Sequence, residues 1–290
     1  MPQNRKTIVK IGLDLIILLT VGIPVLSYHL FGDPYKRGFN CDDDSIRYPY
    51  RDSTISNKVL YVVGVFLPVT VITITEFVNE AGSKKEARGQ TYILLGRPIP
   101  QVVWRIYTRI GVFLFGACMS QLTTDIAKYS IGRLRPHFLD VCKPSINCSL
   151  VIDPHEYIMP ICLGENLKAI REARLSFPSG HSSFSAYTMV YAVIYLQACM
   201  QCKTNRLLKP FMQFLILMMT WFTALSRISD YKHHWSDVLV GFLQGVLVAV
   251  LVAFFVSDLF TKRKKTNSDI VLQNISVDAP TYNTMNSNDT

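Results

Sequence analysis

Three short motifs in this sequence place cations and imidazoles at the ends of long apolar segments. They read Lys128-x6-Arg135-Pro136, Pro178-Ser179-Gly180-His181 and Ser226-Arg227-x5-His233-x3-Asp237. Together the motifs supply three cations, two imidazoles and a carboxylate. Phosphoryl transfer near neutral pH without a metal needs positive charge around the phosphate oxygens, a nucleophile, and a proton donor for the leaving oxygen. The motifs therefore predict phosphoryl transfer through a histidine.

The two histidines have different sequence contexts. His233 and Asp237 are four residues apart, so on a helix they share a face and the carboxylate can hold the imidazole N–H. That bond would fix the tautomer and leave the other ring nitrogen free to attack phosphorus. An isolated pair at this spacing is more often an ordinary capping bond, so the other motifs carry much of the weight. His181 stands at the start of an apolar segment, where a helix N-terminus favours an anion.

The remaining motif residues suit a phosphate. Gly180 lets the backbone approach the phosphate, and Ser179 can donate through its hydroxyl, although Pro-Ser-Gly is also a common plain turn. Arg135 and Arg227 can each grip phosphate oxygens with two donors, and Lys128 adds a point charge. A further acid, Asp125, stands three residues before Lys128, and we expect the two to form an ion pair.

Six apolar segments are long enough to cross a bilayer as helices, which takes about 20 residues each. None shows the strict alternation of a lipid-facing strand. The sequence therefore predicts an all-α membrane protein with six transmembrane helices. The segments lie near Ile8–Leu30, Val59–Val78, Val102–Ala127, Ser182–Cys199, Leu207–Leu225 and Val238–Phe260.

Six spans place both termini on one side of the membrane. Basic residues gather in the N-terminus, in the second and fourth loops, and in Lys262–Lys265 after the last span, which predicts that these parts are cytosolic. We therefore expect a cytosolic N-terminus (1–7), a catalytic membrane domain (8–260) and a cytosolic, disordered tail (261–290), which is polar. With this span count all three motifs lie at the opposite, extracellular or lumenal, face.

The loop between spans three and four contains further signals of an oxidising compartment. It includes the sequon Asn147-Cys148-Ser149, where we expect a glycan. Four cysteines on this side allow two disulfides in three pairings, between which the sequence does not choose. Cys199 and Cys202 fall on the cytosolic side, where such a pair is more often without a function, or palmitoylated, than a metal site. The four cysteines are Cys41, Cys142, Cys148 and Cys162.

The three motifs resemble the signatures of the phosphatidic acid phosphatase type 2 superfamily. The stretches 125–142 and 226–238 are similar to the vertebrate lipid phosphate phosphatases in particular, and the likeness covers roughly residues 14–260. The resemblance implies a haloperoxidase-like helical bundle and a magnesium-independent lipid phosphatase with no cofactor or metal. It assigns His233 as the nucleophile that forms a phosphohistidine, Asp237 as its orienting group, and His181 as the acid and base. It gives the phosphate to Lys128, Arg135, Ser179, Gly180 and Arg227.

The expected partners are lipid phosphates and the surrounding membrane lipids, with a homo-oligomer left open. The family acts on phosphatidate, lysophosphatidate, sphingosine 1-phosphate and ceramide 1-phosphate, at the plasma membrane and in internal membranes. A site at the membrane boundary also favours a lipid, although sugar phosphatases and acid phosphatases carry the same motifs.

Two other classes of function fit the sequence less well. A transporter would carry charged residues near the bilayer midplane, whereas these spans are apolar in their middles. A non-catalytic lipid-binding or adhesion protein would not need the intact His181, His233 and Asp237, although such a role can exist in addition. Nucleic acid is not an expected partner, because the net charge of +9 forms no basic stripe interleaved with aromatics.

Overall fold

The computed structural model describes residues 3–82, 92–146, 148, 151, 153, 155–201 and 205–260 of the chain. The chain divides into two compact units, Met1–Leu259 and Phe260–Thr290, and the fold below is that of the first. The expected tail, the glycan site Asn147 and Cys202 lie outside the described residues.

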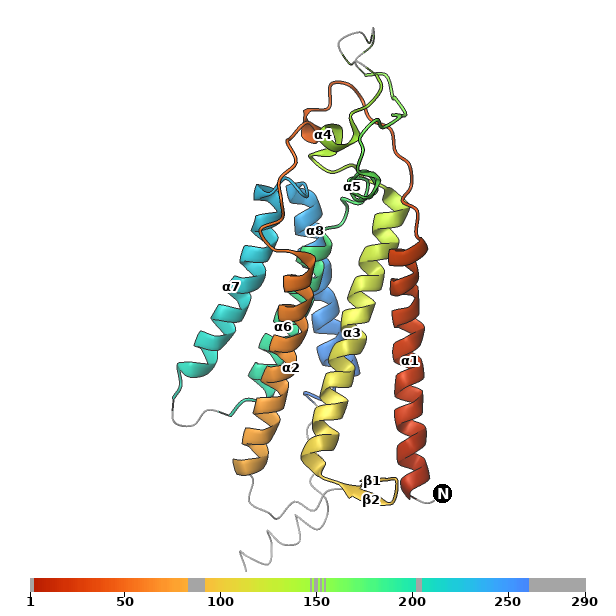
Figure 1. Cartoon of the computed structure of the whole chain (residues 1–290). Coiled ribbons are helices and arrows are strands. Elements are labelled where there is room, and N and C mark those ends of the chain that lie inside the picture. Colours follow the sequence, from red (N-terminus) through yellow and green to blue (C-terminus); the bar gives the residue numbers. More distant parts are fainter. Residues whose placement is uncertain are drawn as a thin grey trace, which may run out of the picture. The chain divides into compact units, whose positions relative to one another are not determined.

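The first unit is built from long helices that run alongside one another in alternating directions (Figure 1). Short elements connect them: a 3₁₀ turn at Asp44–Ile46, the antiparallel hairpin of β1 (Tyr92–Leu94) and β2 (Arg97–Ile99), and the short helices α4 (Phe138–Cys142) and α5 (Leu167–Glu172). The hairpin lies at one end of the bundle, and α4 and α5 lie at the other (Figure 1). The long helices are α1 (Gln3–Phe31), α2 (Asn57–Gly82), α3 (Gln101–Ile131), α6 (Gly180–Cys199), α7 (Leu208–Ser229) and α8 (Trp235–Leu251), which continues into a π-helical turn at Val252–Val256.

The predicted all-α membrane fold is confirmed. Within the described residues, five helices are long and apolar enough to cross a membrane, namely α1, α2, α3, α7 and α8 with its π-helical turn. The sixth predicted span is present as α6, but its composition is more polar. It packs against α2, α3, α7 and α8, and most of its side chains are buried among them. A central helix contacts protein rather than lipid, so it can carry hydroxyl-bearing side chains.

Two glycines let α8 lie directly against α6. A Cβ at Gly241 would stand 2.5 Å from the carbonyl oxygen of Ser179, and one at Gly245 would clash with the carbonyl oxygen of Ser183. Such close backbone approach is typical of small-residue contacts between membrane helices. As a result, the first turns of α8 and α6 start side by side, and the Ser179 N–H donates to the Asp237 carbonyl oxygen over 2.9 Å.

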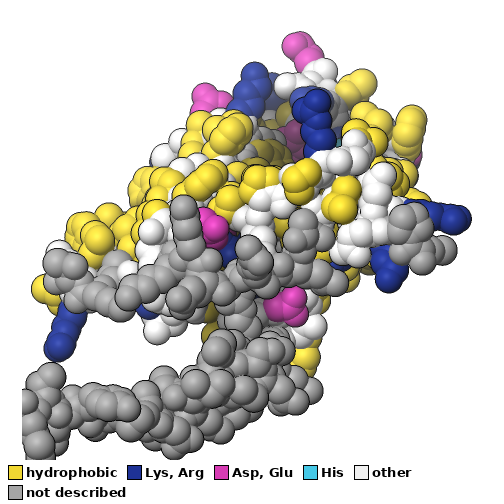
Figure 2. Space-filling model, turned by 90° about the horizontal axis from the view of Figure 1, so that it is seen from below, with side chains coloured by type: hydrophobic (Ala, Val, Ile, Leu, Met, Phe, Trp, Pro, Cys, Tyr) yellow, Lys and Arg dark blue, Asp and Glu magenta, His cyan; other side chains and the backbone are white. Residues whose placement is uncertain are grey.

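The outer faces of the helices are apolar. Large hydrophobic side chains on α1, α2 and α8, such as Ile16, Phe66 and Leu247, are more than half exposed. Figure 2 views the bundle from the hairpin end, and it shows hydrophobic side chains along the flanks of the helices with Lys and Arg at the margins. Surfaces of this kind are stable against lipid and unstable in water.

The segments at the α4–α5 end are joined by two disulfides. Cys41 pairs with Cys148, and Cys142 pairs with Cys162, which is one of the three pairings left open by the sequence. The first bridge attaches the segment between α1 and α2 to the segment between α3 and α6. Among the described residues, Cys118 and Cys199 are not disulfide-bonded.

Candidate active site

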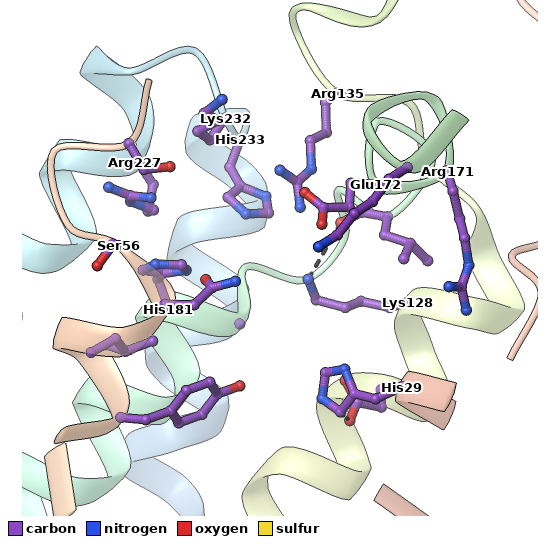
Figure 3. Close-up of a pocket in the computed structure, with 18 of the residues that line it drawn as sticks. His29, Ser56, Lys128, Arg135, Arg171, Glu172, His181, Arg227, Lys232 and His233 are labelled. Atoms are coloured by element: carbon purple, nitrogen blue, oxygen red, sulfur yellow. Dashed lines mark hydrogen bonds and ion pairs between the residues drawn. The ribbon is translucent and has the colours of Figure 1, made fainter. Parts of the chain in front are cut away.

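The three sequence motifs meet around one cavity of about 690 Å³ at the α4–α5 end of the bundle. Figure 3 shows the charged and imidazole side chains that face one another across it. Of the eight motif residues proposed for chemistry or phosphate binding, Ser179 and Asp237 are fully buried and are not among those that line it. The six that line the cavity are Lys128, Arg135, Gly180, His181, Arg227 and His233.

Backbone hydrogen bonds hold the three motifs together. The Arg135 N–H donates to the Ala173 carbonyl oxygen over 2.8 Å, and the Ser176 N–H donates to the Arg133 carbonyl oxygen over 3.0 Å. These bonds align the end of the first motif with the segment that leads into α6. Together with the bond from Ser179 to Asp237, they fix the start of α6 between the other two motifs.

His233 lies in the turn between α7 and α8, and one carbonyl group fixes its backbone. The N–H groups of Lys232 and His233 both donate to the Arg227 carbonyl oxygen, over 3.0 and 3.2 Å. The His233 Nδ1 lies 2.7 Å from the Ser176 carbonyl oxygen. A carbonyl oxygen can only accept, so Nδ1 carries the hydrogen and Nε2 keeps its lone pair.

The prediction of a hydrogen bond between His233 and Asp237 is therefore wrong. The Asp237 Oδ2 lies 3.9 Å from Nδ1, beyond hydrogen-bond distance. The spacing of four residues applies to a helix, but α8 begins at Trp235, so His233 does not share its face. The Ser176 carbonyl oxygen provides the orienting contact, and no sequence pattern marks a backbone acceptor.

Asp237 acts one step further away, through Ser176. Its Oδ2 accepts from the Ser176 Oγ over 2.6 Å and from the His234 N–H over 3.0 Å. Its Oδ1 accepts from Arg133 Nη1 over 2.6 Å. The buried carboxylate thus holds Ser176, which holds the His233 ring. Arg133 was missed by the sequence reasoning, although it stands two residues before Arg135 in the first motif.

His233 is neutral at physiological pH. Burial lowers the pKa of its imidazole well below the usual 6.5, and the positive charges of Arg135 and Lys128 lower it further. A buried neutral imidazole with a free Nε2 is a suitable nucleophile.

The cations around the cavity are held in different ways. Lys128 Nζ donates to the Leu175 carbonyl oxygen over 3.3 Å, and Arg227 Nη2 donates to Asp230 over 2.8 Å. The expected ion pair of Lys128 with Asp125 is not among the contacts of the described residues. Arg135 Nε is buried and has no hydrogen-bond partner among the described residues. An unpaired, buried guanidinium nitrogen in a cavity is well placed to receive an anion.

His181 is held by the segment that precedes α2. Its Nε2 lies 3.1 Å from the Ile55 carbonyl oxygen, so Nε2 carries a hydrogen and Nδ1 remains for proton transfer. The neighbouring Thr54 binds Asp230 through its N–H (2.8 Å) and its hydroxyl (2.7 Å). The segment before α2 is thereby attached to both His181 and the partner of Arg227.

Several cavity residues lie outside the motifs that we singled out. Lys232 lies over the ring of Tyr50, 3.6 Å from its centroid, and burial lowers its pKa to about 8. Its place next to His233 could have marked it. Helix α5 also contributes to the cavity, and no sequence pattern marked its three lining residues, Lys168, Arg171 and Glu172. Among the described residues, no group of three or more His, Cys, Asp or Glu side chains could hold a metal ion.

The chain is similar to a known protein family and to several named proteins. The sequence profile of the PAP2 superfamily matches residues 109–260, which include all three motifs. A Drosophila melanogaster protein named "Putative phosphatidate phosphatase" is 47% identical over 273 residues, which cover 90% of this chain and 72% of that protein. Phospholipid phosphatase 2 of Homo sapiens is 44% identical over 87% of this chain and 84% of its own. Phospholipid phosphatase 1 of Rattus norvegicus is 43% identical over 93% of this chain and 94% of its own. No solved structure matches the chain.

Proposed function

Because this chain belongs to the PAP2 superfamily, we propose that it hydrolyses lipid phosphate monoesters through a phosphohistidine formed on His233. It is a phosphoric monoester hydrolase of the phosphatidate phosphatase type, as its relatives are named. The observation that carries the mechanism is the imidazole of His233. Its Nδ1–H is held by the Ser176 carbonyl oxygen, which leaves Nε2 free in a cavity lined with cations.

In the first step the phosphate binds to the cations and N–H groups of the cavity. Lys128, Arg135 and Arg227 neutralise its charge, and the Gly180 N–H at the start of α6 donates to a phosphate oxygen. The Ser179 N–H already donates to the Asp237 carbonyl oxygen, so Ser179 can contribute only its hydroxyl. His233 Nε2 attacks phosphorus, and the bond from phosphorus to the ester oxygen breaks. Protonated His181 gives its proton to that oxygen, which leaves as the lipid alcohol.

In the second step water hydrolyses the phosphohistidine. Neutral His181 removes a proton from the water, whose oxygen attacks phosphorus while the bond to Nε2 breaks. Inorganic phosphate is released, His181 regains its proton, and His233 is again neutral. Asp237 supports both steps by holding Ser176, and through it the ring of His233.

The proposed substrates are phosphatidate, lysophosphatidate, sphingosine 1-phosphate and ceramide 1-phosphate. A cavity at the end of a membrane-spanning bundle lets the headgroup reach the site while the hydrocarbon chains stay among membrane lipids. The site offers cations and imidazoles for the phosphate charge, which supports an activity that needs neither magnesium nor another cofactor.

We also propose the orientation and the location of the protein. The termini (1–7 and 261–290) are cytosolic and the site faces the extracellular or lumenal side, in the plasma membrane and internal membranes. The basic residues of the cytosolic parts support this orientation, and so do the two disulfides at the end that contains the site. Glycan on Asn147 but not on the tail sequons at Asn274 and Asn288 is the expected result of glycan mapping. Glycan on the tail would reverse the orientation.

The central test is phosphate release from lysophosphatidate by the purified full chain in excess EDTA. We expect the wild type to be active, and the His233→Ala and His181→Ala variants to be inactive but folded. His155→Ala is the matched control, because His155 is an exposed loop residue paired with Asp42. Full activity of His233→Ala, or abolition of wild-type activity by EDTA, would overturn the mechanism.

A second test separates the two histidines. With an ester whose leaving group needs no proton, a His181 variant should still transfer phosphate to His233 and accumulate phosphohistidine, because only hydrolysis then lacks its base. His233 variants should accumulate none. An acid-labile, alkali-stable label that maps to His181 would mean that the two roles are reversed.

A further inference from the structure

The cavity extends beyond the cations into a second, less basic part. This part is lined from three helices, by His29 of α1, Leu60 and Tyr61 of α2, and Gln121 and Asp125 of α3. In Figure 3, Lys128 lies between His233 and His29, so the second part lies on the far side of Lys128 from the nucleophile.

A carboxylate belongs to this second part. Asp125 is buried, and both of its oxygens accept from Gln121 Nε2, over 3.0 and 3.1 Å. The His29 Nε2 is 3.8 Å away, beyond hydrogen-bond distance. A carboxylate can accept about four hydrogen bonds, so Asp125 retains acceptor capacity. A carboxylate in a cavity that binds phosphate repels the charge of the phosphate, and a donor on the same substrate would offset that cost.

The chemistry of the reaction points the substrate's carbon chain toward Asp125. The attacking nitrogen and the leaving oxygen lie roughly in line through phosphorus, so the ester carbons lie on the side away from His233. Asp125 is three residues before Lys128 in α3, which is a rise of about 4.5 Å along the helix. This spacing suits a group attached one carbon beyond the carbon that bears the phosphate.

We propose that Asp125, held by Gln121, binds a hydrogen-bond donor on the carbon next to the phosphate-bearing carbon of the lipid. This inference rests on the proposed function and adds a specificity-determining residue to it. Sphingosine 1-phosphate carries an ammonium at that carbon and 1-acyl lysophosphatidate a hydroxyl. Phosphatidate carries an ester there, which has no donor. Asp125 therefore favours sphingoid and lyso substrates over diacyl phosphatidate.

The test compares enzyme and substrate changes in one cycle. Purified full-length wild type and Asp125→Asn are assayed in mixed micelles with sphingosine 1-phosphate and with its 2-deamino analogue. We expect the preference of the wild type for the amine, as a ratio of kcat/KM values, to fall at least tenfold in the variant. Asp14→Asn is the matched control, because Asp14 is an exposed carboxylate of α1 that accepts from the Tyr107 hydroxyl over 3.1 Å. It should leave the ratio unchanged.

The outcomes separate the inference from the proposed function. If Asp125→Asn changes kcat/KM for both substrates by the same factor, Asp125 is only structural and the inference is overturned. If the wild type hydrolyses neither substrate, the proposed function is overturned and the inference falls with it. If the variant does not fold, the inference is tested instead by the inhibition of the wild type by the reaction products. Sphingosine should inhibit more strongly than its 2-deamino analogue, and equal inhibition would overturn the inference.

Discussion

Substitution of Gly180 by alanine should separate the phosphate site from the fold. Gly180 is the first residue of α6, and an added Cβ would stand 3.5 Å from Lys128 Cε and Nζ and 3.9 Å from Thr124 Cγ2. These are ordinary van der Waals distances, so the folded protein accepts the methyl group. Because alanine restricts the unfolded chain more than glycine does, the variant should gain about 0.4–1 kcal/mol of stability.

The same methyl group should obstruct the substrate. A phosphate oxygen bound to Lys128 Nζ must approach it to about 2.8 Å, and a Cβ only 3.5 Å from that nitrogen occupies part of the required space. Loss of one hydrogen bond to a charged group costs about 1.5–3 kcal/mol. Each 1.36 kcal/mol is a factor of ten in rate, so kcat/KM should fall roughly 10- to 150-fold.

The assay is phosphate release from lysophosphatidate beside thermal unfolding of the same detergent-solubilised samples. Two other glycines are controls. Gly22→Ala in α1 meets open space, so it should gain a similar stability and leave kcat/KM unchanged. Gly241→Ala meets the Ser179 carbonyl oxygen at 2.5 Å and should lower the unfolding temperature. Wild-type kcat/KM in Gly180→Ala would refute the placement of the phosphate. An unfolding temperature as low as that of Gly241→Ala would refute the steric argument.

Four further predictions concern the protonation of His233, the charge of Lys232, the bond between Arg133 and Asp237, and one disulfide. Because the pKa of His233 is lowered, activity should fall on the acid side only well below pH 6.5, where this imidazole becomes protonated. The free energy of unfolding should already decline as the pH falls below 6.5, because the unfolded chain then binds a proton that the folded chain does not. A pH profile also tests Lys232, whose charge is lost above about pH 8, so Lys232→Arg should retain activity there better than the wild type. Arg133→Gln removes the 2.6 Å bond to Asp237 and should cost about 1–3 kcal/mol of stability and lower kcat, as unfolding and phosphate-release assays would show. Replacing Cys142 and Cys162 by serine, which opens a bridge with a sequence separation of 20, should cost about 3 kcal/mol, and a reductant should have less effect on that variant than on the wild type.

The sequence was sufficient to predict that the three motifs meet at one end of the bundle. Apolar length predicted six helices, and their alternating directions placed the three motifs at one end of the bundle. That Lys128, His181 and His233 lie at the same end of the bundle follows from that topology alone. The polar composition of α6 was visible too, but only the packing shows that this helix is central and therefore tolerates it.

The sequence was not sufficient to predict how the site is oriented. The ring of His233 is held by the backbone of Ser176, and carbonyl groups leave no trace in a residue pattern. The start of α8 at Trp235 decided that the spacing to Asp237 was not a helical one, and helix ends are hard to place from sequence. The disulfide pairing likewise depends on which loops lie together in space.

The position of Ser176 also sets the order in which the site is completed during synthesis. Ser176 precedes His233 by 57 residues, with α6 and α7 between them. A growing chain therefore has Lys128 of α3 and the acceptor of Ser176 before it has His233, the proposed nucleophile. A chain that ends after α7 has Lys128 to bind a phosphate, but it lacks His233, the group proposed to attack phosphorus. If His233 is the nucleophile, catalytic competence should arise only once the segment just before α8 has been made, and shorter chains in the membrane should be inert toward lipid phosphates.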